Sequence, residues 1–162
     1  MKKLSLTEWA SIAEIAAAFV VTLSVVYVGL ELNQNTNAIQ QSSYQSTLDT
    51  LTNGDILLAS NAELNTIVTN AEKDPTQLNE EEWSRFSRYA LPRIGAWEYM
   101  FLSKQTNAIS DSHWRGFQPY FEHLACDTGY RVFFEQNTFA YNPEFVTFVE
   151  KVIAACPQQK NQ

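Results

Sequence analysis

Glycine and proline are scarce in this sequence, with five of each among 162 residues. Both favour turns and interrupt helices, so their scarcity predicts few tight turns and long helices. Neither occurs between Gly29 and Gly54. No segment alternates polar and apolar residues for long enough to indicate a β-strand. The sequence therefore predicts an all-α fold with one core, because the chain is too short for two ordinary domains.

Positive charge is also scarce. Eleven Lys and Arg face eighteen Asp and Glu, which gives a net charge of -7 and a pI near 4.8. No Lys or Arg occurs between Lys3 and Lys73. Nucleic acids bind to surfaces that neutralise phosphates, so this balance excludes nucleic acid as an expected partner.

Motifs for metal binding or catalysis are lacking. Cys126 and Cys156 match no metal or redox spacing, and are either a possible disulfide or two small buried side chains. His113 and His123 are ten residues apart, about 15 Å along one helix, so they cannot share a metal without a bend. No nucleophile motif is present. We therefore expect no cofactor, no metal and no catalysis.

The chain does contain a long uncharged run, "IAAAFVVTLSVVYVGL", from Ile15 to Leu30. Extended to Trp9 and Leu32, a helix of this segment would span about 36 Å, enough to cross a hydrocarbon core of about 30 Å. Trp9 and Tyr27 lie toward its ends, where aromatic residues meet the membrane surface. The run predicts a transmembrane helix in a lipid bilayer.

Two other interpretations of this run are a cleaved signal peptide and a buried helix of a soluble core. Lys2 and Lys3 resemble the positive start of a signal peptide. Cleavage needs small residues after the run, but "GLELNQNT" follows it, and the pattern from Ala16 to Ala18 comes too early. An uncleaved anchor is therefore favoured.

The polar sequence after the run has no helix breaker, so one helix is predicted from near Trp9 to near Ala59. Five residues recur at helical spacing within it, four of them suited to a core: Tyr44, Leu48, Leu51, Asp55 and Leu58. The expected divisions are a tail and transmembrane helix (1–33), a helical extension (34–59), a helical bundle (60–157) and a polar tail (158–162).

Small residues lie on two adjoining faces of the predicted transmembrane helix, together with one carboxylate, and they predict a contact with another membrane protein or a second copy of this chain. These residues are Ala10, Ala13, Glu14, Ala17, Ala18, Thr22, Ser24 and Gly29. Glu14 would accept hydrogen bonds from the neighbour. The alternative is that Glu14 lies among lipid headgroups and only marks the start of the helix.

Helix-capping signals divide the rest of the chain. Asn79 is a good N-cap before three glutamates, and Asn142 precedes Pro143 at a helix start. Apolar periodicity continues through Pro92, which predicts a kink and not an end.

Two charged residues of the third helix, Arg93 and Glu98, are possible structural charges. They diverge by about 140° on a helix, so each needs its own partner. For Arg93, Glu122 or Asp127 is conceivable. A buried ion pair is favoured over a catalytic one.

Several short motifs together resemble a family of uncharacterised bacterial single-span membrane proteins. They are "W-x-x-I-A-E-I" from Trp9, "S-V-V-Y-V", "N-Q-N-T-N-A-I", "PRIGAWEYMF", "GYRVFFE" and "FAYNPEFVTFV". The resemblance implies an N-terminal membrane helix, a helical soluble domain and no assigned activity. The family usually has basic residues after the span, whereas Leu32, Asn33, Asn37 and Gln40 stand here.

Lys2 and Lys3 predict a cytoplasmic N-terminus and a periplasmic soluble domain in the bacterial inner membrane, by the positive-inside rule. The expected function is a membrane-anchored helical interaction module, an accessory or scaffold subunit of a larger membrane complex. A sensory protein that relays binding through its long helix is the alternative. An enzyme with an unrecognised helical site is the third and least favoured possibility.

Overall fold

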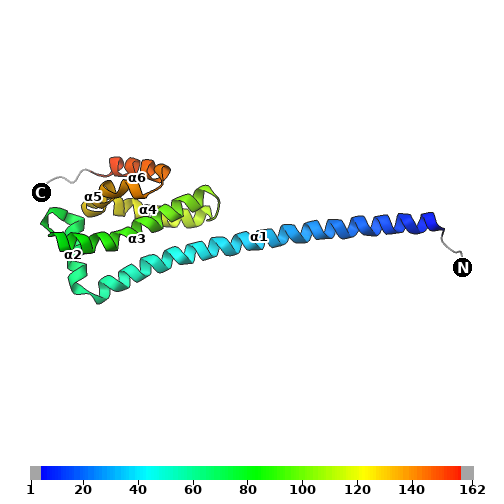
Figure 1. Ribbon diagram of the computed structural model, residues 1–162, viewed down its shortest axis with the longest axis horizontal. Coiled ribbons are helices and arrows are strands. Elements are labelled where there is room, and N and C mark those ends of the chain that lie inside the picture. The colour runs from blue at the N-terminus through cyan, green and yellow to red at the C-terminus, as the bar shows by residue number, and fades with distance from the viewer. Residues whose placement is uncertain (1–4, 158–162) are drawn as a thin grey trace. The chain divides into compact units, whose positions relative to one another are not determined.

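The computed structural model describes residues 5–157, and all regular structure among them is helical, which confirms the all-α prediction (Figure 1). Two short 3₁₀ helices, η1 (Pro75–Gln77) and η2 (Thr138–Ala140), separate some of the α-helices. The α-helices are α1 (Leu6–Ser60), α2 (Ala62–Lys73), α3 (Glu80–Gln105), α4 (Asp111–Cys126), α5 (Thr128–Asn137) and α6 (Pro143–Ala155). Lys2, Lys3 and the polar tail 158–162 lie outside the described residues.

Side-chain caps determine where the helices begin. Asn61, Ser110 and Asn142 each accept a hydrogen bond from a backbone N–H in the first turn that follows, which satisfies a donor that the helix itself cannot. At α3, Asn79 and Glu82 form a capping box. The predicted caps Asn79 and Asn142 are confirmed.

Helix α1 is continuous over 55 residues, as the absence of breakers predicted. Helix α3 likewise continues through Pro92. The chain forms two compact units, Met1–Ile39 and Gln40–Gln162. In the first, the described residues form a single helical segment.

The second unit has an aromatic core. Trp97 of α3 is fully buried and stacks on Phe121 of α4, with ring centroids 5.5 Å apart. The ring of Phe145 of α6 meets Trp97 edge-on at 5.4 Å. Phe86 and Tyr130 form a second edge contact, between α3 and α5. Truncation of a buried aromatic typically costs about 3–5 kcal/mol, so each of these side chains contributes substantially to the stability of the unit.

The C-terminal part of α1 packs on this core through the predicted Leu51, with Tyr44 and Leu58 packed against it, and through two polar residues that were not predicted. Ser43, Thr47 and Leu51 are buried, whereas Leu48 is exposed. Thr47 donates its hydroxyl proton to the carbonyl of Ser43, and Tyr99 donates to the Ser43 hydroxyl at 2.8 Å. The small polar residues are tolerated inside because these bonds satisfy their hydroxyl groups.

Helices α2 and α5 approach so closely that one position requires glycine. A Cβ added at Gly129 would lie 2.5 Å from the carbonyl oxygen of Ala71. This is a steric requirement, since the backbone of Gly129 has no positive φ.

Candidate functional site

The first candidate site is the apolar surface of α1 in the first unit. Every described residue from Ser5 to Ile39 is exposed, including Phe19 at 65% and Val21 at 62%. By length and composition, this helix could cross a membrane, and none of its most apolar window is buried in the structure. A soluble protein rarely exposes a continuous apolar surface of this extent.

All eight residues of the predicted membrane contact lie exposed on α1. Thr22 donates its hydroxyl proton to the carbonyl of Ala18 at 2.9 Å, and Ser24 donates to Val20 at 2.8 Å. These hydroxyls are therefore satisfied within the helix, as a lipid environment requires. A Cβ added at Gly29 would meet nothing within 4 Å. The contact itself stays a prediction.

The second candidate is a charged cluster around Arg93, which is 3% exposed. Its guanidinium donates to the Asp55 carboxylate of α1 and to the Tyr120 hydroxyl of α4 at 2.6 Å. It also lies over the ring of Tyr89, 4.5 Å from the centroid, in a cation–π contact. Among the described residues, its Nε has no hydrogen-bond partner.

The ionic partner of Arg93 is thus Asp55, and not Glu122 or Asp127 as we considered from the sequence. Asp55 is 68% exposed, so only one member of the pair is buried. Gly54 leaves room for the guanidinium, because a Cβ at this position would lie 3.0 Å from Arg93 Nη2.

Burial shifts the titration of the phenols around Arg93. It raises the pKa of Tyr89 to about 12, although the positive charge of Arg93 acts in the opposite direction. The pKa of Tyr120 is raised for the same reason. At about pH 7 these phenols stay neutral, and they provide hydrogen-bonding and aromatic surfaces around the guanidinium.

Glu98, the other predicted structural charge, has a separate role. Its carboxylate accepts the backbone N–H of Asn142 at 2.6 Å. Asn142 in turn caps α6. Glu98 therefore fixes the start of α6 against α3.

A disulfide joins Cys126, the last residue of α4, to Cys156, directly after α6. Both are partly exposed. The bond ties the C-terminal ends of these two helices together.

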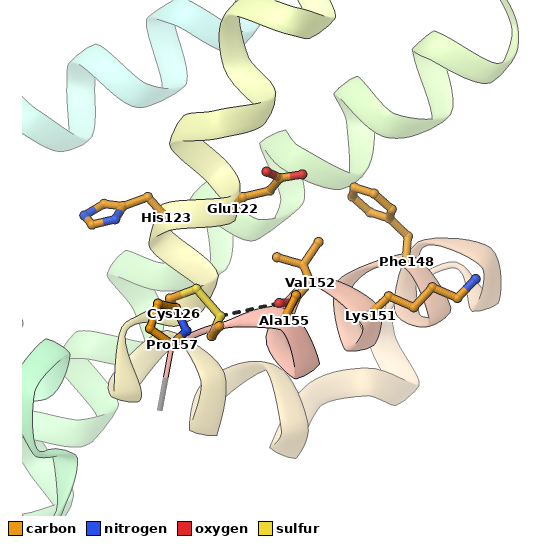
Figure 2. A pocket seen from close by; sticks show the side chains of 9 residues that line it. Glu122, His123, Cys126, Phe148, Lys151, Val152, Ala155 and Pro157 are labelled. Atoms are coloured by element: carbon orange, nitrogen blue, oxygen red, sulfur yellow. Dashed lines mark hydrogen bonds between the residues drawn. A yellow bond between two sulfur atoms is a disulfide. The ribbon is translucent and has the colours of Figure 1, made fainter. Parts of the chain in front are cut away.

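A cavity of about 480 Å³ opens beside the disulfide (Figure 2). Helices α4 and α6 form its walls. Its lining is mostly apolar, with three ionisable side chains, and consists of Glu122, His123, Cys126, Phe148, Lys151, Val152, Ala155, Cys156 and Pro157.

The two histidines lie apart, as their spacing indicated. His113 stacks on Tyr44, with centroids 4.2 Å apart, and His123 is exposed near the end of α4. Within residues 5–157, no group of three metal-ligating side chains is close enough to hold an ion.

Sequence reasoning missed the Asp55–Arg93 pair and the cavity. The one signal for the pair was Asp55 itself, an acidic residue within an apolar helical pattern. No local pattern could have indicated the cavity, because its walls come from helices brought together only by the fold.

No family model, curated protein or solved structure matches this chain. The resemblance to single-span membrane proteins therefore stays a prediction.

Proposed function

We propose that this protein is a membrane-anchored helical interaction module, an accessory or scaffold subunit of a larger membrane complex without catalysis of its own. The observation that carries the proposal is the exposure of every described residue from Ser5 to Ile39 in an apolar helix. Leaving a large apolar side chain in water costs about 1.5–3 kcal/mol of free energy relative to burying it, so a surface of this kind requires lipid or protein around it.

The side of α1 that carries small residues supports a protein neighbour in addition to lipid. Ala10, Ala13 and Ala17 are exposed and have small side chains, so a second helix can approach the backbone closely. Glu14 is exposed beside them and can accept hydrogen bonds from that helix.

The proposed location is the inner membrane of a bacterium, with the N-terminus in the cytoplasm and the second unit in the periplasm. The disulfide between Cys126 and Cys156 supports this orientation, because disulfides persist in oxidising compartments. The lack of Lys and Arg between Lys3 and Lys73 agrees with it.

Affinity purification of the full-length protein from its membrane in mild detergent tests the proposal. We expect co-purification of other membrane proteins at comparable stoichiometry, and their loss on Ala17→Leu or Glu14→Leu. Leu23→Phe is the control, because it also enlarges a side chain but lies about 120° from Ala17 and away from all eight contact residues around the helix. If both contact variants retain every partner, the contact proposal is wrong.

A second candidate is a membrane sensory protein. The observation that favours it is the open cavity between α4 and α6 in the second unit. This function requires a ligand and a protein that receives the signal. Ligand-dependent change in the set of co-purified proteins would distinguish it from a constitutive scaffold.

A further inference from the structure

We propose that the cavity between α4 and α6 binds an organic cation with an apolar body, and that the carboxylate of Glu122 holds the ammonium group. This site lies in the second unit, and it does not depend on the membrane contact proposed above. Its volume of about 480 Å³ falls in the range of small-molecule sites, roughly 300–1,000 Å³.

The apolar part of the lining determines the body of the ligand. Phe148, Val152 and Ala155 of α6 line the cavity together with the disulfide. These groups offer no hydrogen bond to a polar ligand body, whereas contact with an apolar body is favourable because it removes apolar surface from water. The disulfide holds the two walls in place before binding, which reduces the entropic cost of association.

The charges around the cavity determine the ligand's polar group. Glu122 is partly buried, and its Oε1 accepts a hydrogen bond from the neutral amide of Gln118 at 2.7 Å. That bond orients the carboxylate without neutralising it. Among the described residues, no ion pair involves Glu122.

The other two ionisable groups of the lining, His123 and Lys151, are in contact with water, which screens their charges more than that of the partly buried Glu122. In Figure 2, His123 extends from α4 on the side away from Glu122, and Lys151 extends outward along α6. Both are exposed. Phe148 adds an aromatic ring, whose face attracts cations. The net charge of -7 further favours the approach of a cation.

Calorimetric titration of the full-length protein in nanodiscs tests the proposal, with heats from empty nanodiscs subtracted. The probe is 2-phenylethylammonium, and 3-phenylpropanoate is the anion of matched shape. We expect the cation to bind at least tenfold more tightly than the anion. No binding of the cation, or equal affinities, overturns the proposal.

Variants locate the site. Glu122→Gln should weaken cation binding about tenfold or more, because a charge-assisted hydrogen bond becomes a neutral one. Glu150→Gln is the matched control, an exposed glutamate of α6 outside the cavity, and should bind as the unaltered protein does. Ala155→Phe should abolish binding by filling the cavity, with the fold checked by circular dichroism. Unchanged affinity in Glu122→Gln and Ala155→Phe would place the cation elsewhere and overturn the assignment.

Discussion

Arg93 and Asp55 join α3 to α1 across 38 positions of the sequence, with the cation 3% exposed and the anion 68% exposed. The asymmetry matters because a buried guanidinium requires a partner, whereas an exposed carboxylate does not. The pair thus serves to satisfy Arg93, and in doing so it fixes Gln40–Ser60 of α1 on the bundle. Tyr120 extends the same connection to α4.

Removal of the Asp55 carboxylate should destabilise the second unit. We expect Asp55→Ala to lower the free energy of unfolding by about 1–3 kcal/mol, the cost of losing a hydrogen bond to a charged group. The cost stays below that of a fully buried pair because water reaches Asp55. Urea unfolding of the full-length protein in mild detergent, followed by circular dichroism, measures it.

Asp49→Ala is the control for this experiment. Asp49 is also an exposed aspartate of α1, so the change in helix propensity is the same, but it forms no ion pair among the described residues. Equal stability of the two variants would contradict a structural role for the pair.

The same Gly→Ala substitution should change the stability of the protein in opposite directions at two positions. Gly129→Ala should destabilise the protein by about 1–3 kcal/mol, because the new Cβ would lie 2.5 Å from the Ala71 carbonyl oxygen. Gly116→Ala in the exposed part of α4 should stabilise the protein by about 0.5–1 kcal/mol. Alanine has a higher helix propensity than glycine, and its Cβ would meet nothing within 4 Å. Thermal unfolding of both variants tests the close packing of α2 on α5. A gain in stability from Gly129→Ala would refute it.

Local signals predicted the helices of this protein well, and contacts between helices poorly. Asn79 and Asn142 could be recognised because a cap acts on its own helix within three residues. The buried face of α1 includes Ser43 and Thr47, which apolar periodicity could not select. The Ser43 hydroxyl is satisfied inside the protein by the hydroxyl of Tyr99, 56 positions away along the chain. A pattern of neighbouring residues cannot predict a contact at that separation.

Glu72 should make stability depend on pH. Its pKa is raised above the ordinary value of 4.5, chiefly because burial disfavours the charged carboxylate and also because of the negative charge of Asp127. Arg93, His123 and Lys73 partly oppose the shift. Burial raises the pKa of Asp127 as well. A raised pKa means that the folded protein binds the proton more tightly than the unfolded chain does.

The stabilisation from protonated Glu72 is therefore fully present below about pH 4.5, and is lost as the pH rises through the raised value. Glu72→Gln should remove this loss, so the variant gains stability relative to the unaltered protein at about pH 7 and little at about pH 4. Urea midpoints at the two pH values measure the difference. Glu150→Gln, at an exposed site, is the control, and an equal response of both variants would show that Glu72 is not the source.

The disulfide should account for a large share of the second unit's stability. Cys126 and Cys156 are 30 positions apart, and closing a loop of this length in the unfolded chain is worth about 3–4 kcal/mol in the loop-entropy model. We expect a reducing agent to lower the urea midpoint accordingly, and the double variant Cys126→Ala with Cys156→Ala to unfold at the same low midpoint without responding to the reducing agent. The double variant separates loss of the bond from other effects of the reagent. A midpoint that does not move on reduction would mean that the packing of α6 residues such as Phe145 and Val149, together with the Glu98 contact at Asn142, holds α6 in place without the bond.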